Sequence, residues 1–247
     1  MKKSSKTALE SRGIDDSKLI EEYQKLDFSS LAEKLKSPLP TERTAAARVL
    51  SKYKTEECAL ILNHALIKET KIYSKIAISE SLGNLGIISI KYLLPLLGKI
   101  GTNQHKTIAE EKFRKKSFPL PRDIVSRTIT KIGEEALVPL EEFICNEDDS
   151  TISEALDAYG FIIFFSKQKR DSSILIRLYC KTQNLFIKWK IIRALESFTD
   201  NESISLLENV LKDQTCVILH KEAERSLTQI KRINEKNYLT KSMFQPT

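Results

Sequence analysis

The stretch Ile78-Ser-Glu-Ser-Leu-Gly-Asn-Leu-Gly86 gives the pattern from which the fold of this chain can be predicted. Its apolar residues Ile78, Leu82 and Leu85 are four and then three positions apart, which places them on one face of an α-helix. Gly86 follows at once, and glycine commonly ends a helix because it tolerates a left-handed backbone. The stretch therefore indicates the last turns of an amphipathic helix.

The same apolar face recurs along the 247-residue chain. The residues that correspond to Leu82, which we call anchors, are Leu50, Leu82, Ile129, Tyr159, Leu195 and Leu227. The residue before the anchor is small in five of six cases, namely Ser81, Thr128, Ala158, Ala194 and Ser226, and Val49 is the exception. A small residue lets a neighbouring helix come close, so we expect the anchored helices to pack on one another.

Each anchored helix, helix B, follows another helical segment, helix A. We expect helices A at residues 29–36, 55–68, 89–98, 134–145, 172–182 and 200–211. We expect helices B at residues 41–53, 70–85, 121–132, 150–165, 184–198 and 213–233. One hairpin cannot bury its apolar face alone, but a stack of hairpins can. The pattern therefore predicts an all-α fold, an α-solenoid of about six stacked hairpins.

The hairpins belong to a single predicted domain at residues 15–233. Asp15-Asp16-Ser17 caps a helix that we expect to close the N-terminal end of the stack. We expect residues 1–14 to be a flexible N-terminus. Residues 234–247 lack a helical pattern, so we expect a flexible C-terminal tail there.

An insert at residues 102–121 opens the third hairpin. Its positive charge comes from Lys106, Lys112, Arg114, Lys115 and Lys116. We expect its tip, near residues 102–107, to be mobile and Pro121 to lie in the first turn of the following helix. Phe113 and Phe118 would expose apolar area in a solvated loop, so we expect these rings to fold back on the hairpins or to meet a partner.

Several segments resemble HEAT repeats. Those that resemble the second helix of the repeat, above all of the short bacterial type also seen in phycobilisome-lyase-like repeats, are Arg43-Thr-Ala-Ala-Ala-Arg-Val-Leu50, residues 78–86, residues 125–133 and Arg193-Ala-Leu195. Those that resemble its proline-bearing first helix are Leu93-Leu-Pro-Leu-Leu97 and Val138-Pro-Leu140. The resemblance spans residues 28–232 and implies a right-handed, curved superhelix. It also implies a surface for interactions and no particular activity.

Charged residues stand two positions before each anchor. The series is Arg48, Glu80, Arg127, Asp157, Arg193 and Arg225. Stacked hairpins place these side chains next to one another, and the sign alternates through the first five, so we expect ion pairs between neighbouring hairpins. Exposed pairs of this kind stabilise a fold by only about 0–1 kcal/mol each.

Basic or titratable residues stand seven positions before the anchor in five of the six helices B. The series is Arg43, Lys75, Arg122, Lys188 and His220, with Ile152 as the exception. These positions lie near the starts of helices B, at the edge from which the insert emerges. Two interpretations stay open: the side chains cover the anchors with their apolar stems, or they form a basic edge that binds a partner.

Trp189, the only tryptophan, stands between Lys188 and Lys190. A ring between two cations suits stacking on a nucleic-acid base with attraction to phosphate, and the alternative is an ordinary packing residue. The candidate partner-binding residues are therefore Arg43, Lys75, Lys112, Arg114, Lys115, Lys116, Arg122, Lys188, Trp189 and Lys190.

The sequence offers no pattern for catalysis, for a metal or for a cofactor. The only histidines are His64, His105 and His220, and none forms the His-Glu pair that holds iron in HEAT-like deoxyhypusine hydroxylases. HEAT-like alkylpurine DNA glycosylases use several tryptophans and an aspartate, whereas this chain has one tryptophan and no Trp-Asp pair. The four cysteines form no Cys-x-x-Cys pair, so we expect buried thiols in a reducing cytosol.

The chain carries 40 Lys and Arg against 33 Asp and Glu, a net charge of +7, which permits contact with nucleic acid, anionic lipid or acidic proteins. No signal-peptide pattern follows the N-terminal lysines, and the longest apolar run, residues 161–165, is too short to cross a bilayer. We therefore expect a cytoplasmic scaffold that binds another protein, with no membrane partner and no small-molecule substrate. A nucleic-acid-binding HEAT protein, including a HEAT-like DNA glycosylase, is the alternative.

Overall fold

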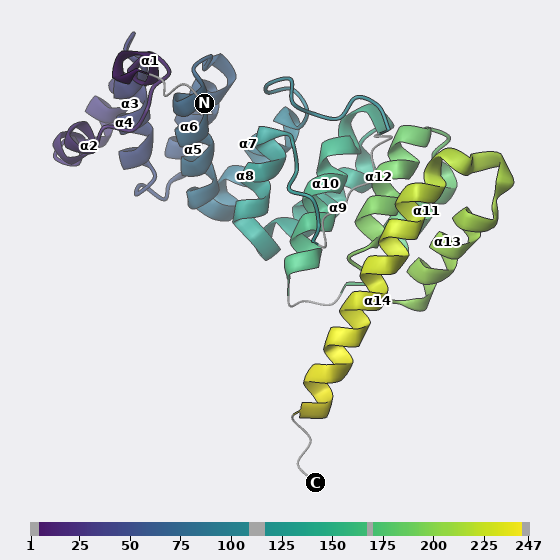
Figure 1. Cartoon of the computed structure of the whole chain (residues 1–247). Coiled ribbons are helices and arrows are strands. Elements are labelled where there is room, and N and C mark those ends of the chain that lie inside the picture. The colour runs from purple at the N-terminus through teal and green to yellow at the C-terminus, as the bar shows by residue number, and fades with distance from the viewer. Residues whose placement is uncertain (1–4, 109–116, 167–169, 244–247) are drawn as a thin grey trace.

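The protein is built from α-helices and short 3-10 helices (Figure 1). The computed structural model describes residues 5–108, 117–166 and 170–243, and within these ranges no strand occurs. The side chains of residue 150 and of residues 236–243 are not described. The chain begins with the short helices α1 (Lys6–Glu10) and α2 (Ser17–Tyr23).

Helices A and B alternate along the rest of the chain. Helices A are α3 (Phe28–Lys34), α5 (Glu56–Lys68), α7 (Ile90–Leu93), α9 (Leu137–Asn146), α11 (Ser173–Lys181) and α13 (Asn201–Lys212). Helices B are α4 (Pro40–Leu50), α6 (Ile72–Leu85), α8 (Ile124–Ile132), α10 (Asp149–Phe165), α12 (Leu185–Leu195) and α14 (His220–Met243). The 3-10 helices are η1 (Gly86–Ser89), η2 (Leu94–Leu96), η3 (Gly133–Ala136) and η4 (Gln214–Leu219).

Successive helices B pack side by side from α4 to α14 (Figure 1). In α4 and α6, the hydrogen-bonded side chains Thr44 and Ser74 lie 30 residues apart near the helix starts, and Ser81 bonds Ala47 over 34 residues farther along. The difference in residue number between the bonded partners stays nearly constant along the two helices, whereas it would change steadily between antiparallel helices. These two helices therefore run parallel, with their starts at the same edge of the molecule.

Helices A form a second layer. Most of them pack on the helix B of the same hairpin, and α5 and α7, α9 and α11, and α11 and α13 pack on one another. The prediction of an all-α chain of consecutive helical hairpins is therefore confirmed.

The anchors lie in the core between these layers. All are buried except Leu227, which is half-buried. Small residues beside the anchors bring neighbouring helices B close, as Ser81 Oγ donates a hydrogen bond to the Ala47 carbonyl at 2.7 Å. A Cβ atom at Gly160 would lie only 2.9 Å from Ala194 Cα. The expected close approach beside the anchors is confirmed.

The last helix is longer than its sequence pattern indicates. We expected it to end at residue 233, but α14 continues to Met243 and projects beyond the other helices (Figure 1). Neither glycine nor proline stands between His220 and Met243, so the backbone can remain helical without the apolar face on which the pattern depends. The predicted end of the last helix at residue 233 is therefore wrong.

The third hairpin departs most from prediction. Its helix A consists of the short α7 and of η2, which contains Pro95, a residue without the N–H that a regular helix uses. Helix α8 begins at Ile124, because the Asp123 side chain caps it by accepting the Ser126 N–H at 2.8 Å. Pro121 therefore lies outside the first turn, contrary to prediction.

The N-terminal segment contacts the first two helices B. Gly13 adopts a left-handed conformation with a φ of 82°, and its carbonyl accepts a hydrogen bond from Thr44 Oγ1 at 2.6 Å. The Arg12 carbonyl accepts the Tyr73 N–H at 3.0 Å. These contacts, and the capping of α2 by Asp16, hold the end of a segment that we expected to be flexible up to residue 14.

The described parts of the insert lie against the start of α8 and against later hairpins. Phe118 is buried against Phe161 and Phe164 of α10, which confirms that this ring folds back on the hairpins. Near the tip, Gln104 donates to the Asp123 carboxylate at 2.8 Å, a contact that the sequence did not indicate. Phe113 lies outside the described residues.

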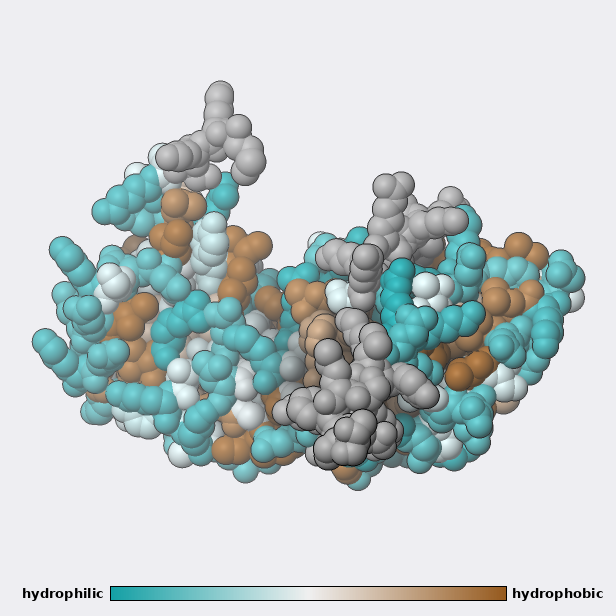
Figure 2. All heavy atoms as spheres, turned by 60° about the horizontal axis from the view of Figure 1, so that its bottom comes forward, coloured by the Kyte–Doolittle hydropathy of each residue, from teal (hydrophilic) through white to brown (hydrophobic). Residues whose placement is uncertain are grey.

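Within the described residues, no helix combines the length and the apolar character that crossing a membrane requires. Figure 2 shows that hydrophilic side chains separate the apolar patches on the face in view.

Candidate interaction site

Arg43, the first of the predicted basic residues, is half-buried and paired with a carboxylate. Its guanidinium forms a two-point ion pair with Glu69, at 2.7 Å from Nε and 2.9 Å from Nη2. Its Nη1 donates to the carbonyls of Ser37 and Pro38 at 2.8 and 3.1 Å. Arg43 therefore ties the loop of the first hairpin to the end of α5, and its charge is not available to a partner.

Lys75, Arg122 and Lys188 lie nearer to solvent. Arg122 is exposed, and Lys75 and Lys188 are half-buried. The Lys188 ammonium lies 5.0 Å from the centre of the Tyr179 ring, so it already forms a cation–π contact within the protein. Of these three predicted residues, Arg122 and Lys75 are the ones best placed to meet a partner.

Trp189 lies in the interior, with 1% of its surface exposed. Its Nε1 donates to Glu222 at 3.0 Å, and its ring stacks on Phe186 with centroids 5.6 Å apart. The Arg193 guanidinium covers the ring at 4.0 Å. The interpretation of Trp189 as an exposed stacking platform is therefore corrected: it is a packing residue, because the hairpins close around it.

Lys190 is fully buried, so it too cannot form part of an exposed edge. Its ammonium contacts two carboxylates of α10, Glu154 at 3.2 Å and Asp157 at 2.5 Å. A buried charge costs several kcal/mol of lost hydration unless it is paired, and these two carboxylates supply the pairing. Lys190 therefore joins α12 to α10.

The ionic contacts continue across the last three helices B. Arg193 of α12 lies 3.9 Å from Asp157 of α10 and 3.6 Å from Glu222 of α14. Arg225 then pairs with both Glu222 and Glu196. We call these seven buried or nearly buried residues the ionic cluster: Glu154, Asp157, Lys190, Arg193, Glu196, Glu222 and Arg225.

The insert and the residues just before it cover one side of the ionic cluster. His105 meets the Trp189 ring edge-on, with centroids 5.4 Å apart, and a Cβ atom at Gly98 would lie 3.6 Å from Glu154 Cγ. Burial and the nearby positive charges of Arg193 and Lys190 lower the pKa of His105 to about 4. His105 is therefore neutral at pH 7, and it covers the cluster without adding charge.

The predicted ion pairs between neighbouring hairpins, formed by the residues two positions before each anchor, are present in part. Arg48 pairs with Glu80 of the next helix B, and Asp157 lies near Arg193 as described above. Arg127 is exposed, and its Nε donates to the Pro121 carbonyl at 2.5 Å. These ion pairs are therefore half-exposed in the first hairpins and buried in the last ones.

Glu196 makes the ionic cluster sensitive to pH. Burial raises its pKa from the usual 4.5 to about 7, although the positive charge of Arg225 acts in the opposite direction. The folded protein therefore holds a proton on Glu196 at pH values where the unfolded chain has lost it. The protonated Glu196 side chain therefore adds to the free energy of unfolding below pH 4.5, and this contribution is lost as the pH rises to about 7.

Replacement of Glu196 by glutamine removes this dependence. Between pH 5 and 8 we expect the wild-type free energy of unfolding to fall by about 3 kcal/mol relative to Glu196→Gln. Urea unfolding at several pH values measures both proteins, and Glu202→Gln, an exposed change on α13, serves as the control. Parallel pH profiles for wild type and Glu196→Gln would contradict the assignment.

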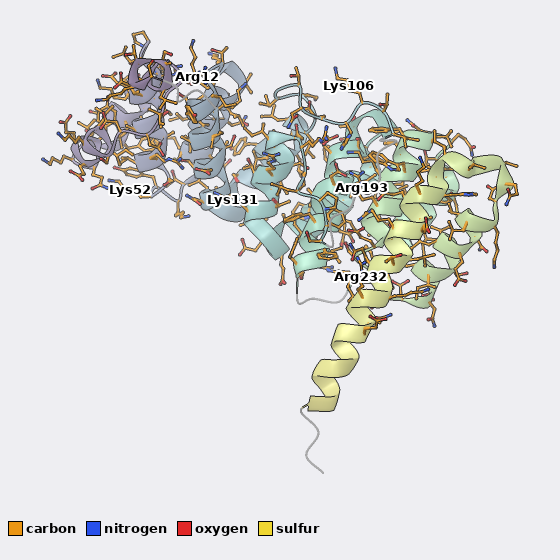
Figure 3. All side chains as sticks on the ribbon, in the orientation of Figure 1. Arg12, Lys52, Lys106, Lys131, Arg193 and Arg232 are labelled. Carbon is orange, nitrogen blue, oxygen red and sulfur yellow. The ribbon has the colours of Figure 1, made fainter. Side chains whose placement is uncertain are left out.

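Five other cations lie near the start of α6 and in the segment between η2 and α8, which includes the insert. They are Lys71, Lys75, Lys99, Lys106 and Arg122, which we call the basic edge; all are exposed except the half-buried Lys75. Within the described residues, none of the five forms an ion pair. Figure 3 places Lys106 on the edge along which the insert runs, and Lys52 and Lys131 on the opposite edge. Five cations that form no ion pair with any described residue therefore lie together at one edge of the second and third hairpins.

The remaining predicted cations, Lys112, Arg114, Lys115 and Lys116, lie outside the described residues. Sequence reasoning expected Asp157, Arg193 and Arg225 to form ion pairs, but it missed the carboxylates Glu154, Glu196 and Glu222 of the ionic cluster. The sequence did carry a pattern for this cluster. A charged residue stands five positions before three of the anchors, three residues before the charged position already noted; these residues are Glu154, Lys190 and Glu222. Two charged positions on one helix face would have indicated a network across several hairpins.

No protein-family model matches this chain, and no curated protein matches it either. The function is therefore inferred from the fold and the site.

Proposed function

We propose that the protein is a non-enzymatic α-solenoid scaffold of the HEAT type that binds an acidic partner protein along the basic edge. The contact of each helix B with the next, the parallel run of α4 and α6, and a second layer of helices A support a stack of about six hairpins. The resemblance to HEAT repeats implies that this stack is right-handed. Such a stack presents long edges formed by the loops of successive hairpins, and these suit an elongated partner.

The proposal depends on one observation: charged residues are ion-paired in the ionic cluster, whereas the cations of the basic edge are not. Inside, each residue of the ionic cluster meets a residue of opposite charge within 4 Å. At the basic edge, Lys71, Lys75, Lys99, Lys106 and Arg122 have no acidic partner within the described residues. Unpaired like charges repel one another, and an acidic surface relieves that repulsion while it speeds association.

Nucleic acid is the competing partner, since the same cations attract phosphate. Non-specific nucleic-acid binding usually adds aromatic rings on which bases stack. Trp189, the residue that would have supplied such a ring, lies in the interior. The burial of this ring favours a protein partner.

Charge reversal at the basic edge tests the proposal. We expect Lys75→Glu, Lys106→Glu and Arg122→Glu together to weaken the binding of a fluorescent polyglutamate peptide at least about tenfold, a change of about 1.4 kcal/mol. Fluorescence anisotropy at low salt measures the affinity. Because all three side chains reach solvent, circular dichroism should show an unchanged helix content.

The matched control reverses Lys52, Lys231 and Arg232, which are exposed; Figure 3 places Lys52 and Arg232 away from the basic edge. It changes the net charge by the same amount, so an equal loss of peptide binding in both variants would contradict a localised site. A labelled DNA oligonucleotide measured in parallel distinguishes the partners. If DNA binds more tightly than polyglutamate and responds to the same variant, the partner is nucleic acid and the proposal is wrong.

A further inference from the structure

A groove opens between α3 and α5, next to the basic edge. It has a volume of about 490 Å³ and is lined by the end of α3, the loop after it and the last turns of α5. Its origin is the unequal length of the two helices, since α3 has 7 residues and α5 has 13. The last turns of α5 therefore lack a neighbouring helix A on this side.

The floor of the groove is apolar. Leu35 from the end of α3 faces Ile61 and Ala65 of α5 there. On α5, the exposed Leu60 and Ile67 flank these lining residues, because they lie on the adjoining stripe of the same helix. They lie on the far side of His64 and Lys68 from Ile61 and Ala65, so they border the groove without forming part of its floor.

The mouth of the groove is basic. Lys36, His64 and Lys68 line it and are exposed. Glu69 is the one acidic residue that lines it, and its carboxylate already binds Arg43 and the backbone N–H groups of Thr70 and Lys71. Lys36 pairs with Glu33 at 2.6 Å, but both side chains are at least 70% exposed, so the pair can open at little cost.

The equivalent groove of the fourth and fifth hairpins has a mixed charge. It lies between α9 and α11 and is lined by Glu147, Asp148 and Asp149 as well as by Arg177 and Lys181. The repeating fold therefore makes a groove at both places, whereas the local sequence makes only the first one distinctly basic. This second groove supplies an internal control.

We propose that the groove between α3 and α5 binds an extended segment of the partner protein in which an apolar side chain is flanked by carboxylates. The inference rests on the proposed function, and it names what the partner presents. The apolar side chain fills the space above Leu35, Ile61 and Ala65. The carboxylates face Lys36 and Lys68, and the segment continues toward Lys71 at the basic edge.

Two labelled peptides test the inference: polyglutamate with one central leucine, and the same peptide with serine in its place. We expect the leucine peptide to bind at least about tenfold more tightly, because a buried leucine side chain favours binding over an exposed one. Ala65→Trp fills the groove and should abolish this preference, while the serine peptide binds as before. Leu178→Trp, in the equivalent groove between α9 and α11, should leave the preference intact.

Equal affinity for the two peptides, or a preference that survives Ala65→Trp, overturns the inference. If both peptides bind equally and the charge-reversal variant of the basic edge loses them, the groove proposal fails and the proposed function stands. If neither peptide binds the wild-type protein, both proposals fail. Urea unfolding of Ala65→Trp and Leu178→Trp establishes that both variants are folded before binding is measured.

Discussion

Replacing Lys190 by methionine should lower the free energy of unfolding by about 3–5 kcal/mol, the cost of removing one partner from a buried ion pair. Methionine keeps much of the side-chain length, so the change removes the ammonium and leaves little empty space. Glu154 then loses the cation that compensates its charge, and Asp157 keeps only the more distant Arg193. Urea unfolding followed by circular dichroism measures the loss.

The loss should shrink as the pH falls. Burial already raises the pKa of Glu154, and the positive charge of Lys190 opposes that rise, so its removal raises the pKa further. A protonated carboxyl group needs no cation, and the variant therefore regains stability in acid relative to wild type. Lys188→Met, on the same helix but half-buried, is the matched control and should cost less than about 1 kcal/mol. Equal losses for the two lysine variants would contradict the buried role of Lys190.

Replacing Trp189 by alanine should cost about 3–5 kcal/mol, the usual range for removing a large aromatic side chain from a packed interior. The change removes the stack on Phe186 and the hydrogen bond to Glu222. It also uncovers Arg193, whose guanidinium lies over the ring. Thermal or urea unfolding measures the loss of stability.

Trp189→Phe separates the packing of the ring from its hydrogen bond. Phenylalanine keeps an aromatic ring but cannot donate to Glu222, so we expect a loss of about 1–2 kcal/mol. The wild-type fluorescence gives a second readout, since Trp189 is the only tryptophan and should be shielded from a soluble quencher until the protein unfolds. Full quenching in the folded protein, or a stability unchanged in Trp189→Ala, would show that the ring is exposed after all.

Much of the fold could be predicted because its information is local. The spacing of Ile78, Leu82 and Leu85 marks one helix face, and the same spacing around the other anchors located most of the helices. Small residues such as Ser81 marked where helices approach. Prediction failed where the local signal is absent: the end of α14 carries no apolar face, and α8 starts from the cap at Asp123 and not from Pro121.

The candidate site was harder to predict, since identical residue types serve opposite purposes in it. Arg43 and Arg122 both stand seven positions before an anchor, yet one is bound to Glu69 and the other is exposed. Lys188 and Lys190 flank the same tryptophan, and only Lys190 is fully buried. Position in the repeat therefore predicts the helix face, but it does not predict whether a charge meets a partner.

The sequence by itself determined the helices, their order in hairpins and the face that each buries, because these depend on spacings of three and four residues along one segment. Only the tertiary structure decided which charges are buried. That outcome depends on segments far apart in the chain, such as the insert residue His105 lying on Trp189, and the repeating pattern carries no information about where an insert folds back. The physical reason is that burial of a charge is set by everything that surrounds it, whereas helix periodicity is set by the backbone alone.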